Sequence, residues 1–469
     1  MTTNKHTSVG VLLIYGGLAL PLCIAETPII AYLPAFYARE LHLGVSLVGL
    51  VFLLARLWDG VSDILVGWTS DLLTSRFGRR KPFVVVGAPL LMASTWFLCN
   101  PPKGAGLIYL SIWVILFYAS FTSVKVPHIS WGTELATEYV DRSRVTTYRE
   151  AFTMIGFLLF VTAPLVMSED ESHLAGVLFL IAVVTLVTVP MATVPLGIFV
   201  GDPIVTQRDT RKPFSEFLAL ARNSTFMRYL IARLLYATEE GVANSLLVFS
   251  FSVGFDLHNK LFQAIFFLYV ANLLTMPITL RLARKVDKHR ILAIGLSIQA
   301  CVYLVMTFAP AGNFNCIVFL YIIVGCAGTA ILSMPSSILA DIIDRGEADS
   351  GSRSSGAYVA VDNLIYKLGM ALGVGISFGL LGLFHFDPSA EHHSAADVLH
   401  IRLLGFALPC ILSAASMVVY LRHPITREMQ QELRQKLESR RSINDLTSNG
   451  EIPAMNEREE SRAAVYEEG

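Results

Sequence analysis

The chain has 469 residues, of which 54% are hydrophobic and 16% charged, and its mean hydropathy of +0.57 is higher than that of soluble globular domains. The net charge of −1 argues against nucleic-acid binding, which needs a basic face, so we expect no nucleic-acid partner. The six cysteines are scattered singly, without metal-ligand spacing, and no metal site is predicted from them. The composition predicts a membrane protein surrounded by a lipid bilayer.

Long apolar windows recur along the chain after a short polar start that shows no removable signal peptide. A bilayer core needs about 20 apolar residues per helix, so each window predicts a transmembrane span. Spans 1 to 12 are 10–38, 43–72, 83–100, 106–136, 145–167, 174–200, 227–255, 261–283, 289–309, 314–340, 355–385 and 401–422. The predicted fold class is an all-α membrane protein.

Lys and Arg gather in alternate loops, which predicts the orientation of the spans. Two opposite segments, 168–173 and 386–397, contain neither residue type. Both termini are therefore expected on the cytoplasmic side of a multi-pass inner (plasma) membrane protein. The basic side carries Arg76, Arg79, Arg80, Lys81, Arg142, Arg144, Arg208, Arg211, Lys212, Arg222, Arg284, Lys285, Lys288, Arg290, Arg345 and Arg353.

The chain also divides into two similar halves. A tight basic turn follows the second span of each half, at 71–82 and 281–290. The expected domains are a six-helix bundle at 1–200, a cytoplasmic central loop at 201–226, a second six-helix bundle at 227–423 and a charged, disordered cytoplasmic tail at 424–469.

Charged residues within spans are costly in a bilayer, so those retained there generally mark a transport pathway. In span 2, Arg56, Asp59 and Asp63 follow at i, i+3 and i+7 and share one helical face, with Ser62 beside them. Carboxylates and a hydroxyl can hold a hard monovalent cation or a transferable proton. The alternative is that Arg56 and Asp59 only neutralise each other in packing, which leaves Asp63 unexplained.

Further charged and polar residues occur in five other spans. Lys125 of span 4 precedes Pro127, which frees a backbone carbonyl and bends the helix as a cavity wall would require. Arg149 of span 5 is either an interface anchor or a cavity cation. The remaining candidates are Glu26 in span 1, Glu239 and Glu240 in span 7, and Asp362, Asn363 and Lys367 in span 11.

His128 of span 4 is interpreted as a satisfied interior histidine, because no second metal ligand lies at ligand spacing. The sequence lacks the GxxxxGK[ST], GxSxG and HExxH motifs, so we do not expect an enzyme. Active transport by this chain would have to be driven by an ion gradient.

These residues also indicate a resemblance to a known family. The segment ARLWDGVSDILVGW (55–68) followed by SRFGRRKP (75–82) resembles the cation-site helix of the glycoside, pentoside and hexuronide cation symporters, the melibiose permease branch of the major facilitator superfamily. The resemblance implies the major facilitator fold, with 12 helices in two six-helix bundles. It also implies sodium or proton coupling at Asp59 and Asp63, with Ser62 and Thr122 at the cation site and Arg149 and Lys367 near the substrate.

The chain departs from the sugar-binding members at two positions. Cys23 and Lys125 stand where those members carry acidic residues that grip the sugar. A cavity with Lys125, Arg149 and Lys367 favours an anion such as a hexuronide or sugar acid, although Glu26 could restore a carboxylate for a neutral glycoside. An exporter or facilitator of a lysolipid or siderophore-like solute remains an alternative. We expect a monomer that binds a small solute and needs no cofactor beyond a coupling ion.

Overall fold

The computed structural model describes residues 8–72, 75, 78–135, 139–166, 174–201, 223–257, 260–283, 285–350, 355–388, 390, 392–422, 424 and 428–430. All regular structure in these residues is helical. Nearly all of the expected central loop and tail falls outside the described residues, so those two predictions receive no structural account.

The first half contains helices α1 to α8. They are α1 (Val9–Gly17), α2 (Ala19–Ala31), α3 (Leu33–Arg39), α4 (Val45–Leu72), α5 (Lys81–Cys99), α6 (Leu107–Leu135), α7 (Tyr139–Val166) and α8 (Leu174–Phe199). The predicted continuous span 1 is divided into α1, α2 and α3, with breaks at Leu18 and Tyr32. Pro34 lies in the first turn of α3 and has no N–H to continue the helical ladder across the second break.

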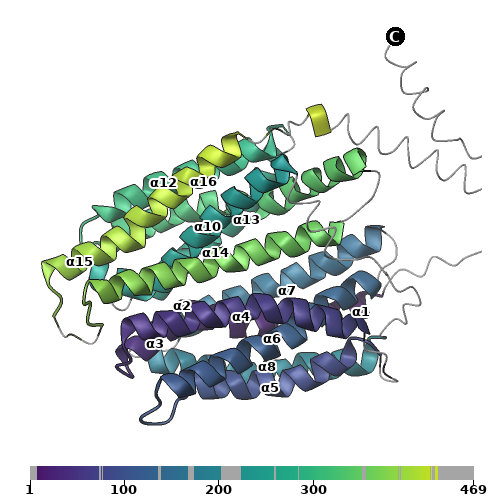
Figure 1. Cartoon of the computed structure of the whole chain (residues 1–469), viewed down its shortest axis with the longest axis horizontal. Coiled ribbons are helices and arrows are strands. Elements are labelled where there is room, and N and C mark those ends of the chain that lie inside the picture. The colour runs from purple at the N-terminus through teal and green to yellow at the C-terminus, as the bar shows by residue number, and fades with distance from the viewer. Residues whose placement is uncertain are drawn as a thin grey trace, which may run out of the picture.

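The second half contains helices α10 to α16 and two short π-helical segments. They are α10 (Ser224–Phe249), η1 (Ser250–Gly254), α11 (Leu261–Leu282), α12 (Lys288–Thr307), α13 (Phe314–Ser350), α14 (Ser355–Leu383), α15 (Ala395–Arg402), η2 (Leu403–Ala407) and α16 (Leu408–Leu421). Joined at their short breaks, the helices of both halves form the twelve predicted rods. Figure 1 shows the first half as the lower group of rods and the second half as the upper group.

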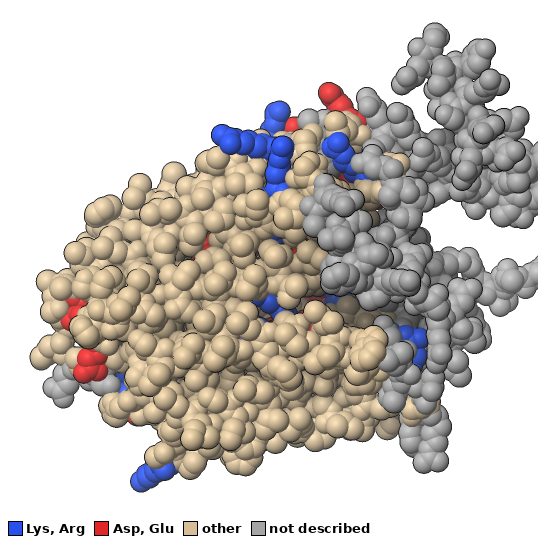
Figure 2. Space-filling model, in the orientation of Figure 1, with Lys and Arg blue, Asp and Glu red and all other residues tan. Residues whose placement is uncertain are grey.

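Ten helices among the described residues are long and apolar enough to cross a membrane. The other two rods are α7 with 28 residues and α10 with 26, which have the length but carry charged residues within the helix. In Figure 2 the lateral face is almost entirely uncharged, apart from basic and acidic atoms that show in a seam between the two halves. The protein is therefore a multi-pass membrane protein of two helical bundles, as predicted.

The two bundles meet along α4 and α14, with further contacts of α7 with α11 and of α2 and α3 with α10. Within the second bundle, α10 packs closely on α14 because glycines face each other at the crossing. A Cβ on Gly373 would lie 2.6 Å from the Val242 nitrogen, and one on Gly241 would lie 2.5 Å from the Met370 carbonyl oxygen. Small residues at such crossings let helix backbones approach in a membrane protein.

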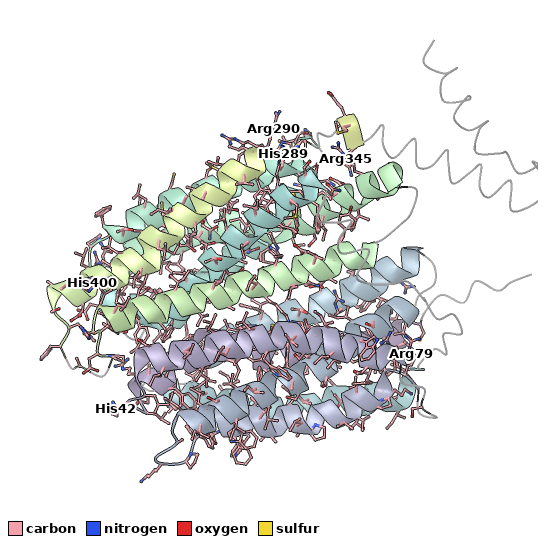
Figure 3. The ribbon with its side chains drawn as sticks, in the orientation of Figure 1. His42, Arg79, His289, Arg290, Arg345 and His400 are labelled. Atoms are coloured by element: carbon pink, nitrogen blue, oxygen red, sulfur yellow. The ribbon has the colours of Figure 1, made fainter. Side chains whose placement is uncertain are left out.

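The ends of the bundle differ in charge. Figure 3 places Arg79, Arg290 and Arg345 toward one end of the rods and His42 and His400 at the other. We call these the basic end and the opposite end. The basic end is the one expected from the sequence to face the cytoplasm.

Candidate functional site

The buried face of α4 carries the two aspartates that the sequence singles out. Asp59 is 1% exposed, whereas the side chain of Asp63, one turn further on, is 28% exposed. Thr122 of α6 lies between them, with its Oγ1 3.2 Å from Asp59 Oδ1 and 3.0 Å from Asp63 Oδ1. Ser62 donates to the Asp59 carbonyl at 2.9 Å and lies 3.2 Å from Thr122 Oγ1. The side-chain oxygens of these two hydroxyls and two carboxylates therefore form one cluster.

Lys367 of α14 reaches across the bundle boundary to this cluster. Its Nζ lies 2.8 Å from Asp59 Oδ2 and 2.5 Å from Asp63 Oδ2, and its side chain is 17% exposed. Arg56 approaches Asp59 less closely, at 3.5 Å, and its guanidinium stacks over the Tyr118 ring at 4.9 Å. The ammonium of Lys367 therefore lies between the two carboxylates, which are the predicted cation ligands. The predicted packing pair of Arg56 and Asp59 exists, but Asp59 shares its charge with Lys367.

A second ion pair joins α2 to α6 within the first bundle. Lys125 Nζ lies 3.0 Å from Glu26 Oε2 and 4.8 Å from the centre of the Phe121 ring. Their side chains are 37% and 24% exposed, so solvent reaches both. Lys125 is thus neutralised by Glu26, the carboxylate that the sequence analysis kept as a possible ligand of a neutral glycoside.

A cavity of about 550 Å³ connects these groups between the bundles. This volume is within the usual range of roughly 300 to 1,000 Å³ for small-molecule sites. Its charged lining residues are Arg56, Lys125 and Lys367 against Glu26, Asp63 and Glu240, and its other polar residues include Thr27, Ser130, Asn244, Asn363, Tyr269 and Tyr366. The charges balance, so the cavity lacks the cationic excess that the sequence predicted.

Three predicted residues lie away from this cavity. Arg149 does not line it and pairs with its neighbour Glu150 at 2.7 Å. Cys23 faces Gly156 of α7, while Thr27, one turn further along α2, supplies the polar lining group. Asp362 accepts from Tyr229 at 2.9 Å and pairs with Arg233 at 3.3 Å. Arg149 and Cys23 are therefore absent from the lining of this cavity, because spacing along a helix does not fix which neighbour a face meets.

His128 is satisfied within the first bundle, as the sequence predicted. Its Nε2 lies 2.9 Å from the Tyr15 carbonyl oxygen, and the Tyr15 hydroxyl donates to the His128 carbonyl at 3.0 Å. The two rings are in contact, with centroids 4.3 Å apart and planes tilted by 31°. His128 thus links α1 to α6 and takes no part in the cavity.

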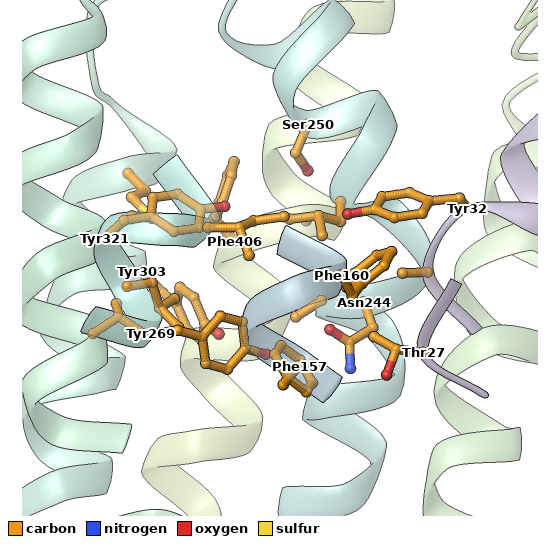
Figure 4. Close-up of a pocket in the computed structure, with 18 residues that line it drawn as sticks. Thr27, Tyr32, Phe157, Phe160, Asn244, Ser250, Tyr269, Tyr303, Tyr321 and Phe406 are labelled. Carbon is orange, nitrogen blue, oxygen red and sulfur yellow. The ribbon is translucent and has the colours of Figure 1, made fainter. Parts of the chain in front are cut away.

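Toward the opposite end, the cavity adjoins a smaller aromatic chamber of about 120 Å³. Figure 4 shows Tyr269, Tyr303, Tyr321 and Phe406 on one side of the chamber and Tyr32 on the other. Thr27, Phe157, Asn244 and Tyr269 line both spaces, so the chamber lies directly beside the charged cavity. Ser250 of η1 and Phe406 of η2 also line it. π-Helical segments often occur at functional sites.

Aromatic contacts between the bundles close the chamber at its far side. The Tyr32 ring lies 5.6 Å from Phe262 of α11 and 5.8 Å from Phe160 of α7. Tyr32 is 1% exposed and Phe262 is 6% exposed. The wall of the charged cavity toward the basic end contains Val126, Ile129 and Ser130 of α6.

Sequence reasoning missed several of the lining residues. Tyr366 donates to Glu240 at 2.8 Å across the contact of α14 and α10. Asn244 follows Glu240 by four residues, and this i, i+4 spacing was a usable signal that both share a face. Tyr269 and Phe157 gave no signal, because aromatic residues at helical spacing are equally expected in a core or facing lipid.

Two helical bundles with a polar cavity between them, reached by charged residues from both sides, define a secondary transporter of small solutes. The function is transport rather than catalysis.

Comparison with known proteins gives the family. Residues 14–427 match the family described as MFS/sugar transport protein, so the chain belongs to this family of the major facilitator superfamily, as predicted. It is 21% identical over 433 residues to the glucuronide carrier protein homolog of Escherichia coli (strain K12), covering 88% of this chain and 92% of that one. It is also 21% identical over 483 residues to the sodium-dependent lysophosphatidylcholine symporter 1-B of Danio rerio, covering 91% and 87%.

Solved structures share the fold. A bacterial homolog of the human lysosomal transporter Spinster superposes with a TM-score of 0.66 at 14% identity, covering 91% of this chain and 99% of that one. At this identity the likeness establishes the major facilitator fold alone.

Proposed function

We propose that the protein is a symporter that couples the movement of an anionic, sugar-like solute to a sodium ion or proton bound at Asp59 and Asp63. The observation that carries the proposal is the position of the Lys367 ammonium, 2.8 Å and 2.5 Å from these two carboxylates. A protein cation in that place competes directly with a coupling ion. Asp59, Asp63, Ser62 and Thr122 would supply the oxygen ligands of sodium, or the carboxylates would take up a proton.

Cation binding would also release a contact between the bundles. Asp59 and Asp63 belong to α4, and Lys367 belongs to α14 of the other bundle. An ion pair across the boundary holds the two bundles together, whereas a cation on the carboxylates removes the attraction. The bundles could then rock around the cavity, as alternating access requires.

The balance of charge connects the ion to the charge of the solute. Arg56 and Lys367 neutralise Asp59 and Asp63 within this cluster. A bound sodium ion or added proton leaves one excess positive charge in a mostly buried place, which is unfavourable unless an anion accompanies it. The released ammonium of Lys367 is then available to bind a carboxylate of the solute. This is why an anion is preferred even though the whole cavity has no cationic excess.

The aromatic chamber limits the remainder of the solute. Its volume of about 120 Å³ is close to that of a cavity of roughly 150 Å³ that binds benzene. We therefore propose a sugar acid that carries a ring-sized apolar group, with the acid near Lys367 and the ring near Tyr269. The glucuronide carrier homolog among the relatives supports a sugar acid.

A second candidate is an amphipathic lipid such as a lysophospholipid. The adjoining charged and aromatic spaces, together with the lysophosphatidylcholine symporter among the relatives, favour it. The small volume of the chamber argues against a long acyl chain in this conformation. For either solute we propose that the protein acts as a monomer. We also propose that both termini lie in the cytoplasm, which the position of the basic end supports.

Uptake into proteoliposomes tests the proposal. Phenyl glucuronide, phenyl glucoside, glucuronate and lysophosphatidylcholine are compared under an inward sodium gradient, an inward proton gradient and no gradient. We expect gradient-driven accumulation of phenyl glucuronide above glucuronate, and little of the uncharged phenyl glucoside. Preferred accumulation of the glucoside would contradict the anionic solute, and preferred transport of the lysolipid would support the second candidate.

A further inference from the structure

A buried carboxyl group in the second bundle has no place in the mechanism above. Glu239 of α10 is 1% exposed. The other acidic residues that are similarly buried within the described part of the chain each have a basic partner: Asp59 with Lys367, Asp341 with Lys288 and Asp362 with Arg233. No Lys, Arg or His forms an ion pair with Glu239 among the described residues. An ionised carboxylate without such a partner is very costly at this depth.

Only one of the two carboxyl oxygens of Glu239 accepts a hydrogen bond from the described residues. Gln299 of α12 donates from its Nε2 to Glu239 Oε1 at 3.3 Å and is 3.0 Å from the Tyr303 hydroxyl. Both Glu239 Oε2 and Gln299 Oε1 are buried without a partner. When Glu239 is ionised, both of these atoms can only accept hydrogen bonds. One proton on this carboxyl removes its unpaired charge and turns one of its two acceptor oxygens into an O–H donor.

Neighbours of Glu239 line the charged cavity and the aromatic chamber. The next residue, Glu240, lines the charged cavity, and Tyr303 lines the aromatic chamber. The titratable groups that face Glu239 are Tyr236 and Glu240 of its own helix and Tyr303 of α12. Tyr366 of α14 is engaged by Glu240, and Arg233 of α10 is engaged by Asp362. None of these contacts supplies a positive charge to Glu239.

We propose that Glu239 is a proton-binding site of the transport cycle, separate from Asp59 and Asp63, which holds a proton in this conformation. The proton resides on the carboxyl as an O–H group. During the cycle, water of the adjoining cavity reaches the carboxyl and accepts this proton. Glu239 is then an ionised carboxylate until it takes up another proton. The inference adds a proton to the cycle proposed above and rests on that function only for the exchange step.

Infrared spectroscopy of the purified protein tests the bound proton without any transport. At neutral pH we expect a carboxylic-acid C=O band that shifts in heavy water, disappears in Glu239→Gln and moves in Glu239→Asp. The Asp63→Asn variant should retain it. A wild-type spectrum in which neither Glu239 variant changes any protonated-acid band would overturn the proposal. Glu239→Gln should also fold with wild-type thermal stability because it resembles the neutral acid, and loss of folding would count equally against it.

Transport tests the exchange step. Wild-type gradient-driven uptake should fall about tenfold per pH unit above the apparent pKa of the site, because a one-unit pH change alters the protonated fraction by that factor. Glu239→Gln should lose this dependence and keep solute exchange across the membrane. An unchanged pH profile in the variant would overturn the role in the cycle. If no gradient drives any solute while the infrared band responds as expected, the symport proposal fails and the proton site stands.

Discussion

Replacing Lys367 with Met should make the site at Asp59 and Asp63 bind its cation more tightly. The ammonium lies 2.8 Å from Asp59 Oδ2 and 2.5 Å from Asp63 Oδ2, in the place proposed for the ion. Met keeps an unbranched apolar side chain of similar length and removes the charge. The variant thereby removes the competitor while the oxygen ligands stay in place.

The magnitude follows from the charges. Two unit charges about 4 Å apart attract by roughly 4 kcal/mol at an effective dielectric constant of about 20. In the wild type, part of the cost of displacing the ammonium is offset because the released ammonium regains its hydration. We therefore expect the binding free energy of the cation to improve by about 1.4 to 2.8 kcal/mol in the variant. This corresponds to an affinity that is roughly tenfold to a hundredfold higher. Without the cation, breaking a buried ion pair should destabilise the protein by about 3 to 5 kcal/mol.

Thermal unfolding of the purified protein measures both effects. The melting temperature is followed over a series of sodium concentrations and pH values, because a ligand that binds only the folded state raises stability with its concentration. Lys367→Met should melt lower than wild type without sodium or at high pH, and should regain stability at lower cation concentration. Lys125→Met is the matched control, since Lys125 pairs with Glu26 instead. An affinity in Lys367→Met equal to or weaker than wild type would refute the competition between Lys367 and the coupling ion.

Three further predictions concern other parts of the structure. Asp63→Asn should abolish gradient-driven accumulation and leave a folded protein that exchanges solute; accumulation at the wild-type level would argue against the cation site. Exchanging the charges of the Lys125 and Glu26 pair in a double variant should restore part of the transport lost in Lys125→Glu alone, and equal defects in both would show that the pair is not coupled. Gly373→Ala should destabilise the protein by about 1 to 3 kcal/mol because its Cβ meets α10, whereas Gly379→Ala, which meets nothing within 4 Å, should melt like wild type.

The fold was predictable because each rod has to be apolar for its whole length. Most span boundaries derived from twenty-residue windows agree with the helices to within a few residues. The exceptions are α13, which extends ten residues past the predicted end at 340, α7 and α15, which each begin six residues before the predicted start, and the first span, which is divided at Leu18 and Tyr32. The helical face of Arg56, Asp59 and Asp63 was predictable for the same reason, since helical periodicity fixes which residues of one helix lie together.

The contacts between helices were not predictable from periodicity. Lys125 meets Glu26 and Lys367 meets Asp63 only because of how separate helices pack, and neither pairing has a signal in local spacing. The same limit explains Arg149, whose charge the resemblance placed near the solute but whose partner is its own neighbour Glu150. Because of these pairings, the positive and negative side chains that line the cavity are equal in number, and the cavity is not cationic.

The most direct test of the account measures the coupling between solute and ion in both directions. The affinity for phenyl glucuronide is determined with and without saturating cation, and the affinity for the cation with and without saturating phenyl glucuronide. Because coupling is reciprocal, both affinities should rise by the same factor, about 5-fold to 150-fold for a typical coupling. The effect should vanish in Lys367→Met. Solute binding that is independent of both sodium and pH would contradict the central claim that a cation displaces Lys367 to admit an anion.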